Sequence, residues 1–275
     1  MRMDLDKAAQ IIQLFCEGCG VRAVERMTGI NRHTILDLIE TVGRKCQDFL
    51  DARICNVTVE SVQCDELFAF VWCKEGNNHS KDPERGAQYC FLAIDRQSKA
   101  ILSFLVGKRS AENCDLFMAD LRKRIRLGSQ VTTDGFQGYL GAVYDSFGHN
   151  IQFAQQIKTY ADYGTKKAAE DGHRRYSPEG VTSVRNLIHI GNPDVTKIST
   201  SHVERTNLSM RLFCRRFTRL TLGYSKKIEN LRYSLAIFIV FFNWIRTHSA
   251  HGQTPAQAID LTDHAWTIRE LLENL

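Results

Sequence analysis

The sequence predicts an α/β protein in which a mixed sheet is flanked by helices and preceded by a small all-α domain. Two observations lead to this class: residues before Val57 have helical spacing, and from Val57 onward alternating, β-rich runs are separated by amphipathic helices. The expected organisation is a three-helix domain at 1–45, a linker at 46–56, an α/β domain at 57–247 with a basic insertion at 155–197, and a helical C-terminal tail at 248–275.

Three short helices are predicted at the N-terminal end. Residues 28–31 form a tight turn before a third helix at Arg32–Thr41, with Asn31 as its N-cap. A short helix, a turn and a second helix are typical of a helix-turn-helix, in which early residues of the last helix meet base edges in the major groove. The candidate DNA contacts are Asn31, Arg32, His33 and Thr34. A plain helical bundle used for dimerisation is the alternative.

The α/β part follows in a definite order. The predicted elements are strands at 59–72, Tyr89–Ile94 and Ala100–Val106, a helix at Ala111–Ile125, a strand at Gln130–Thr133, a helix at Phe136–Phe147 and a strand at Asn150–Ala154. The next 43 residues, 155–197, are polar and basic with little periodicity. This segment is long for a loop in a compact domain, so we expect it to be functional or mobile, and to lie near the substrate.

A helix is then expected from Ser201 through Phe217. Glu204, Asn207 and Arg211 are spaced i, i+3 and i+7, so they share one helix face. Leu208, Leu212 and Phe213 have a different phase and can face a core.

Two earlier carboxylates are candidate partners of Glu204. Asp65 lies within the first predicted strand, and Asp134 directly follows the strand that ends at Thr133. Each acid alone reads as a solvated or capping residue, but the three together favour Mg²⁺ or Mn²⁺, because hard oxygen ligands select these ions. Two such ions can activate a water or a 3′-hydroxyl and stabilise the leaving oxygen of a phosphoryl transfer. Asp65 would then bridge both ions, and Asp134 and Glu204 would each complete one.

The positive charge is concentrated in one part of the chain. The net charge is +5, yet the stretch from Arg205 to Arg246 has nine basic residues against Glu229 alone. A basic stripe beside metal ligands suits a polyanionic substrate, although ordinary solvated helix faces would give the same pattern. The candidates for DNA contact in this stretch are Arg205, Arg215, Arg216 and Arg219.

The cysteines and the apolar runs bound the cellular context. Nine cysteines, an odd number scattered through apolar runs, indicate free thiols in a reducing cytoplasm, and the close pair Cys16 and Cys19 has no second pair to complete a zinc site. The apolar run Leu235–Phe242 is too short to span a bilayer, so it is predicted to be a buried helix and no membrane partner is expected.

Three motifs carry a resemblance to a known family. They are Cys64-Asp65-Glu66-Leu67-Phe68, Thr133-Asp134-Gly135-Phe136-Gln137-Gly138-Tyr139, and His202-Val203-Glu204-Arg205-Thr206-Asn207 followed by Arg211. With these motifs the sequence resembles DDE transposases of bacterial insertion sequences, most closely the insertion-sequence-one type, over most of the chain.

The resemblance implies a ribonuclease H-like catalytic domain with Asp65, Asp134 and Glu204 as the catalytic and metal-binding triad. Asn207 and Arg211 match its supporting polar and basic positions. Gly20-Val21-Arg22-Ala23 matches the opening of the second helix of the helix-turn-helix, which adds Arg22 to the candidate DNA contacts.

The function expected from this family is a transposase that binds terminal inverted repeats of double-stranded DNA, cleaves the ends and joins them to target DNA. It would use two Mg²⁺ or Mn²⁺ ions, act as a homodimer or higher oligomer, and be associated with the nucleoid. A structure-selective nuclease of the same fold and a transposase-derived DNA-binding regulator are the alternatives.

Overall fold

The N-terminal part consists of three helices, as the sequence predicts. The structure is a computed structural model that describes residues 3–160 and 180–275, with helices α1 (Leu5–Cys16), α2 (Val21–Thr28) and α3 (Arg32–Arg53) at its start. Gly29 ends α2 in the left-handed conformation, with φ 71°, which glycine adopts without a steric penalty. The Asn31 side chain accepts a hydrogen bond from the His33 N–H, so the predicted N-cap of α3 is confirmed.

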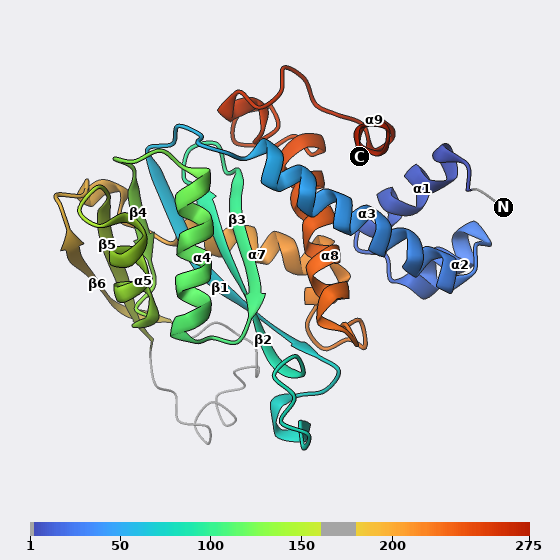
Figure 1. Cartoon of the computed structure of the whole chain (residues 1–275), viewed down its shortest axis with the longest axis horizontal. Coiled ribbons are helices and arrows are strands. Elements are labelled where there is room, and N and C mark those ends of the chain that lie inside the picture. The colour runs from blue at the N-terminus through green and yellow to red at the C-terminus, as the bar shows by residue number, and fades with distance from the viewer. Residues whose placement is uncertain (1–2, 161–179) are drawn as a thin grey trace.

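Helix α3 is much longer than the sequence analysis predicts. It continues beyond Thr41 to Arg53, so most of the expected linker at 46–56 is helical. Cys46, Phe49 and Leu50 are buried in the same hydrophobic core as the sheet. The helix extends because this second half packs against α8 (Ile228–Val240), as Figure 1 shows, and tertiary burial stabilises a helix more than local propensity does.

The centre of the molecule is a six-stranded mixed sheet with the order β3-β2-β1-β4-β5-β6. The strands are β1 (Ser61–Val71), β2 (Gly86–Asp95), β3 (Ile101–Gly107), β4 (Gln130–Thr133), β5 (Gln152–Tyr160) and β6 (Val181–Ile190). β4 runs parallel to β1 and β5, and the other neighbours are antiparallel. The predicted mixed sheet is therefore confirmed, with one strand more than expected.

The additional strand, β6, lies in the segment that the sequence analysis describes as an irregular basic insertion. β5 runs on to Tyr160, and β6 returns antiparallel to it. All but two of the β6 side chains are exposed, so the strand has no alternation of buried and exposed positions to reveal it. Lys166, Lys167, His173, Arg174 and Arg175 of this insertion lie outside the described residues.

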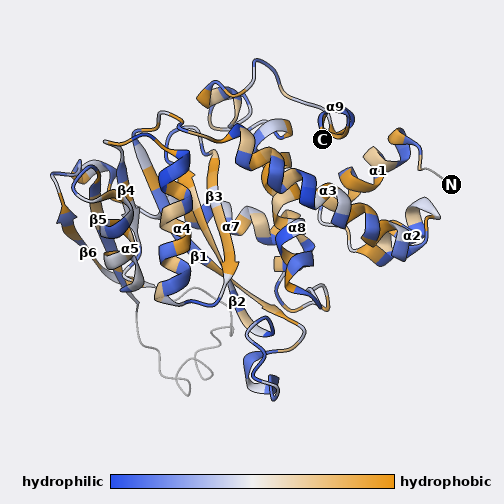
Figure 2. Ribbon diagram, viewed as in Figure 1, coloured by the Kyte–Doolittle hydropathy of each residue, from blue (hydrophilic) through white to orange (hydrophobic). Residues whose placement is uncertain are grey.

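Helices cover both faces of the sheet. α4 (Ala111–Arg124) and α5 (Gly138–Phe147) pack on one face, and α7 (Ser201–Phe213) lies behind the sheet on the other (Figure 1). Strands β2 and β3, which lie between these helical layers, are mainly hydrophobic (Figure 2). Helices α4 and α8 carry hydrophilic residues on their outer sides. This layering places α7 directly over β1, the strand that carries Asp65.

The helix that carries Glu204 differs from its prediction in two respects. α7 ends at Phe213, and a separate 3-10 turn, η3 (Arg215–Phe217), follows. Leu208 and Leu212 are 45% and 64% exposed, so their predicted core position is wrong. The buried face of α7 is formed instead by Val203, Thr206, Asn207 and Met210. The polar face of the predicted amphipathic helix is thus partly turned toward the sheet.

The apolar segment near the C-terminal end is a buried helix, as predicted. Residues 235–242 are all buried, and α8 continues into a π-helical turn, η4 (Phe241–Ile245). By length and composition Ile228–Ile245 is the one helix of the described chain that could cross a membrane, and 72% of it is buried inside the protein. In η4 the Asn243 side chain accepts from Ile101 N–H at 3.0 Å and donates to Ile101 C=O at 2.8 Å, against edge strand β3.

The tail at 248–275 is only partly helical. The segment after Thr254 forms a 3-10 turn, η5 (Gln257–Ile259), and the last helix, α9 (Ile268–Asn274), starts with a capping box between Thr267 and Glu270. An ion pair between Arg269 and Asp6 connects α9 to α1, so the two ends of the chain are packed together (Figure 1).

Candidate active site

The two aspartates are brought together by the parallel pairing of β1 and β4. Gln63 pairs with Thr132, and the pairing ends there because β4 itself ends at Thr133. The same register continued by two residues places Asp65 beside Asp134. The sheet therefore opens at this point, and the opening is lined by carboxylates.

A third carboxylate at this opening is Glu66, which the sequence analysis does not select. Carboxylate oxygens of Asp65, Glu66 and Asp134 lie within 4.8 Å of one another. Successive side chains of a strand point to opposite faces, so adjacency to Asp65 gives no reason to expect Glu66 in the same site. The two meet because β4 has ended and no longer separates the two faces of the sheet. The signal available in the sequence is only that a second acid directly follows Asp65 in a strand that is otherwise uncharged.

The two faces of the sheet supply different partners to these acids. On the α4/α5 face, Arg109 donates from Nε to Glu66 Oε2 at 2.9 Å and from Nη2 to Asp134 Oδ2 at 3.1 Å. On the α7 face, Asn207 Nδ2 donates to Asp65 Oδ2 at 2.7 Å. The predicted supporting role of Asn207 is consistent with this contact, which links the helix directly to the first aspartate.

Helix α7 is fixed on β1 by its first turn. Gln63 Oε1 accepts hydrogen bonds from the backbone N–H groups of His202 and Val203 at 3.0 and 3.2 Å. These N–H groups belong to the first turn, where a helix has no carbonyl partners of its own. The contact sets the position of α7 two residues before Asp65 and so determines where Glu204 and Asn207 lie.

Glu204, like Asn207, is on α7, but it is not part of the cluster of Asp65, Glu66 and Asp134. Its Oε1 forms an ion pair with Lys158 of β5 and accepts from Thr200 Oγ1 at 2.7 Å. The group of carboxylates within 4.8 Å of one another contains Glu66 and not Glu204. Lys158, from the predicted basic insertion, is thus a residue of the site, and the expectation that this segment lies near the substrate stays a prediction.

Burial and mutual repulsion perturb the pKa values of the acids. Burial first, and then the negative charges of Glu66, Asp134 and Glu204, together raise the pKa of Asp65 to about 7. Burial also raises the pKa of Glu66, with Asp134 as the next cause, although Tyr139 and Arg109 oppose the shift. A site with this balance of charge favours the binding of a cation.

The donor set fits a hard divalent cation. The three members of the cluster all offer carboxylate oxygens, and no cysteine belongs to it, although the free thiols of Cys64 and Cys114 are near. Glu66 Oε1 and Asn207 Oδ1 are buried and have no hydrogen-bond partner within the described ranges. Because buried polar atoms are almost always paired, these oxygens are suited to a ligand at the opening. Asp65, Glu66 and Asp134 could hold Mg²⁺ or Mn²⁺, with Glu204 beside them.

Arg211 is close enough to the site to interact with it. Burial and the charge of Arg219 together lower the pKa of Arg211 to about 10, while Asp65 opposes the shift. Arg211 is therefore close enough to both Asp65 and Arg219 to interact with them.

The predicted helix-turn-helix residues are all at the surface. Arg22, Asn31, Arg32, His33 and Thr34 are exposed. Asn31 uses its side-chain oxygen to cap α3, and the backbone N–H of Arg32 donates to Glu25 Oε1 at 2.9 Å. Arg22, Arg32, His33 and Thr34 therefore remain candidates whose side chains are exposed and do not cap a helix.

The four basic candidates near α7 fall into two groups. Arg205 and Arg219 are exposed and Arg215 is half-buried, but Arg216 is mostly enclosed. Arg216 Nη1 donates to the carbonyl oxygens of Gly223 and Tyr224 at 3.4 and 3.3 Å. Arg216 therefore supports the loop between η3 and α8, and its contact with DNA stays a prediction.

Comparisons with known proteins give remote structural similarity. No protein-family model matches the sequence, and no curated protein matches it. One similar solved structure is a simian T-cell lymphotropic virus intasome in complex with PP2A regulatory subunit B56 gamma, at 14% identity and a TM-score of 0.39, covering 91% of this chain and 73% of that chain. Another is a piggyBac transposase synaptic complex with hairpin DNA, at 11% identity and a TM-score of 0.42, covering 100% and 70%.

Proposed function

We propose that this protein is a transposase that binds the ends of a mobile element and catalyses metal-dependent cleavage and transfer of DNA strands. The observation that carries the proposal is the opening between β1 and β4, where Asp65, Glu66 and Asp134 converge and α7 presents Asn207 and Glu204. Divalent ions at such a site would activate the attacking water or 3′-hydroxyl and stabilise the leaving oxygen. The residues of the chain position these ions and the DNA phosphate.

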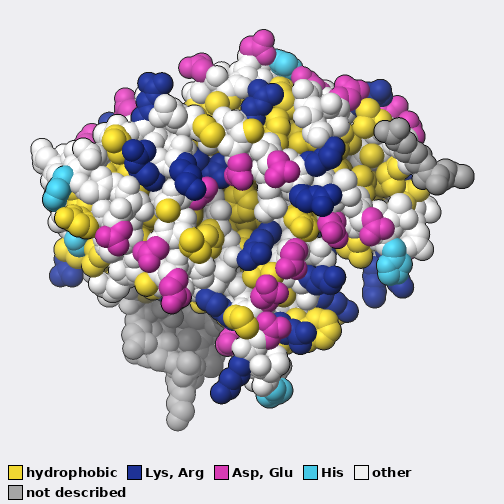
Figure 3. Space-filling view, in the orientation of Figure 1, with side chains coloured by type: hydrophobic (Ala, Val, Ile, Leu, Met, Phe, Trp, Pro, Cys, Tyr) yellow, Lys and Arg dark blue, Asp and Glu magenta, His cyan; other side chains and the backbone are white. Residues whose placement is uncertain are grey.

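The charge next to the site supports a polyanionic substrate. Between Glu204 and Glu229 there is no acidic residue, and this stretch contains the exposed residues Arg205, Arg219, Lys226 and Lys227. Basic and acidic side chains are interspersed on the molecular face that carries α3 and α4 (Figure 3), so that face offers no field of one sign. The DNA is therefore proposed to approach along α7 and the loop after it.

The N-terminal helices are proposed to supply sequence recognition. The exposed start of α3, with Arg32 and His33, would enter the major groove, and α2 would support it. A homodimer or higher oligomer is proposed because joining two ends requires two copies of the site.

The test is a cleavage assay with the full chain. Supercoiled plasmid DNA should be nicked in the presence of Mg²⁺ or Mn²⁺, and Asp65→Asn, Asp134→Asn or Glu204→Gln should each reduce the rate by about 100-fold or more. DNA binding, measured by fluorescence anisotropy, should persist in these variants. Asp115→Asn, which removes an exposed acid from α4, is the control and should cleave normally. Full cleavage by the Asp65 and Asp134 variants would rule out the site.

Strand joining separates the transposase from the alternatives. The DNA on either side of the reading frame is to be searched for short inverted repeats, and a substrate that ends in them should give joined products. Cleavage without joining would indicate a structure-selective nuclease, and repeat binding without any metal-dependent chemistry would indicate a DNA-binding regulator.

A further inference from the structure

Glu66 has the properties of a metal ligand rather than of a surface acid. Its side chain is 2% exposed, and one oxygen accepts from Arg109. The other, Oε1, is buried near the Tyr139 hydroxyl, but neither of these two oxygens lies within hydrogen-bond distance of a partner in the described part of the chain. Leaving a buried carboxylate oxygen unpaired is costly. Since this carboxylate also lies within 4.8 Å of those of Asp65 and Asp134, a cation shared with these acids would satisfy it.

Arg109 already places one cation at the cluster. Its guanidinium contacts both Glu66 and Asp134, and it stacks on the Phe136 ring at 4.1 Å from the centroid. A single positive charge is thus shared between two of the three acids. The Arg109 side chain is 37% exposed, so it can turn toward solvent without crossing the core.

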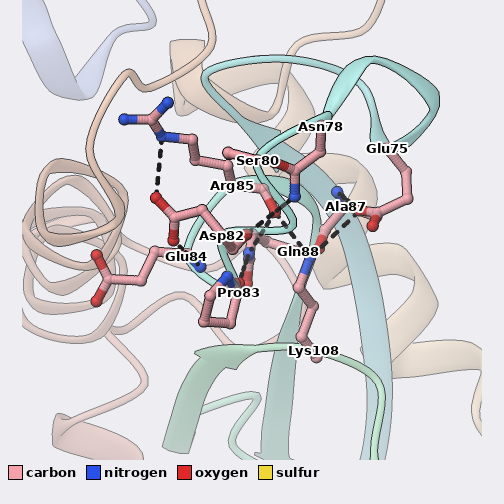
Figure 4. A network of polar contacts seen from close by, with 10 residues as sticks. All are labelled: Glu75, Asn78, Ser80, Asp82, Pro83, Glu84, Arg85, Ala87, Gln88 and Lys108. Atoms are coloured by element: carbon pink, nitrogen blue, oxygen red, sulfur yellow. Dashed lines mark hydrogen bonds and ion pairs between the residues drawn. The ribbon is translucent and has the colours of Figure 1, made fainter.

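The backbone that carries Arg109 is held firmly, which limits any movement to its side chain. Lys108 Nζ donates to Glu75 Oε2 at 3.2 Å and to the carbonyl oxygens of Arg85 and Ala87 at 2.7 and 2.9 Å, in the network at the start of β2 (Figure 4). The carbonyl oxygen of Lys108 accepts from Asn113 Nδ2 at 2.8 Å. The side chain and the carbonyl group of Lys108 are therefore both hydrogen-bonded, which fixes the backbone next to Arg109.

We propose that Glu66 is a further ligand of the divalent cation at this site. Without the metal, the Arg109 guanidinium neutralises Glu66 and Asp134. When the metal binds, Arg109 releases both carboxylates. The inference rests on the proposed function only in requiring a metal at the cluster. The competing explanation is that Glu66 serves only as the structural partner of Arg109. The two explanations predict different effects of removing the arginine.

The experiment measures Mn²⁺ binding to the full chain by isothermal titration calorimetry at pH 8. Glu66→Gln should weaken Mn²⁺ binding by about 10- to 100-fold, because a ligand is lost. Arg109→Gln should strengthen it by roughly fivefold, because a competing cation is removed. Glu112→Gln, which removes an exposed acid from the first turn of α4, should leave the affinity unchanged. Circular dichroism confirms that each variant is folded.

Arg109→Lys provides the second measurement, because it retains the charge and should bind Mn²⁺ more weakly than Arg109→Gln. Wild-type affinity in Glu66→Gln, or weakened binding in Arg109→Gln, would overturn the inference. If Asp65→Asn and Asp134→Asn weaken Mn²⁺ binding while Glu66→Gln does not, only the role of Glu66 fails. If neither aspartate variant affects binding, the proposed metal site itself fails.

Discussion

The Asp65 carboxylate is the residue on which burial and charge act most strongly at the site. It is flanked by Glu66 and Asp134, and its pKa is raised to about 7. A proton can therefore neutralise it near physiological pH. The same environment that makes ionisation costly makes the binding of a divalent cation favourable, so protons and metal compete for one group.

Metal affinity should consequently depend on pH. At pH 6 about one-tenth of Asp65 is ionised and at pH 8 about nine-tenths, so the affinity for Mn²⁺ should rise roughly tenfold between these values. Calorimetric titrations of the wild-type chain at several pH values measure this change. Binding that is the same at both pH values would show that Asp65 ionises well below pH 6.

The metal-free protein should be less stable when Asp65 is charged. Because its folded pKa lies above the ordinary value of 3.8, the folded state binds the proton more tightly, and stability falls as pH rises from about 4 to about 7. Asp65→Asn removes this cost and should raise the free energy of unfolding at pH 8 by about 1 to 3 kcal/mol.

Urea denaturation in EDTA measures this difference, with Asp115→Asn as the control that should have no effect. An Asp65→Asn chain less stable than wild type at pH 8 would contradict the electrostatic account.

At the scale of elements, the loop between η3 and α8 depends on one arginine. Arg216 donates to two of its carbonyl oxygens, and the backbone N–H of Trp72 donates to Ser225 C=O at 2.9 Å at the end of β1. The loop exposes Leu222 almost fully, at 93%, beside the exposed residues Arg219 and Lys226. The loop therefore presents exposed basic side chains to solvent, while the enclosed Arg216 side chain holds its backbone in place.

Substitutions of Arg216 and Arg219 should distinguish the residue that supports the loop from the residue that contacts DNA. Arg216→Ala should lower the free energy of unfolding by about 1 to 3 kcal/mol, because the loop carbonyls lose their buried donor. Arg219→Ala should leave stability unchanged and weaken DNA binding, with a shallower salt dependence. Thermal unfolding and fluorescence anisotropy measure the two effects. Equal stability of the two variants would show that Arg216 does not support the loop.

The sequence predicts the elements whose signals are local. The N-cap of α3, the strand before Asp134 and the helix that carries Glu204 and Asn207 are all confirmed, because capping chemistry and apolar periodicity are encoded in neighbouring residues. β6 and the second half of α3 are not predicted, since one is exposed and the other is stabilised by α8. Glu66 joins the site only because β4 ends where it does, which is a property of the sheet rather than of β1.

At the scale of the molecule, the N-terminal helices and the sheet share one hydrophobic core. The buried residues of α1 and α3 are continuous with those of the strands and of α8. The contact between α3 and α8 is close at Gly43, where an added Cβ would lie 2.4 Å from Tyr233 Cβ and 2.8 Å from Tyr233 Cα. The helices that are proposed to read DNA sequence are therefore rigidly attached to the catalytic sheet.

Gly43→Ala should lower the free energy of unfolding by about 1 to 3 kcal/mol through overpacking. Gly141→Ala is the matched control, because Gly141 also lies in a helix and an added Cβ would meet nothing within 4 Å, so this variant should be neutral or more stable by about 0.5 to 1 kcal/mol. Urea denaturation followed by fluorescence and by circular dichroism should give a single coincident transition in wild type. Two separate transitions would contradict the shared core.

The amide of Asn243 has a consequence for how copies of this chain can associate. By pairing with both backbone groups of Ile101, it occupies a place on the outer margin of β3 where a foreign strand would otherwise form hydrogen bonds. Arg232 covers a second carbonyl, that of Val106, on the same strand. Sheet growth by strand addition is thereby directed to β6, at the opposite margin and next to the strand that carries Lys158.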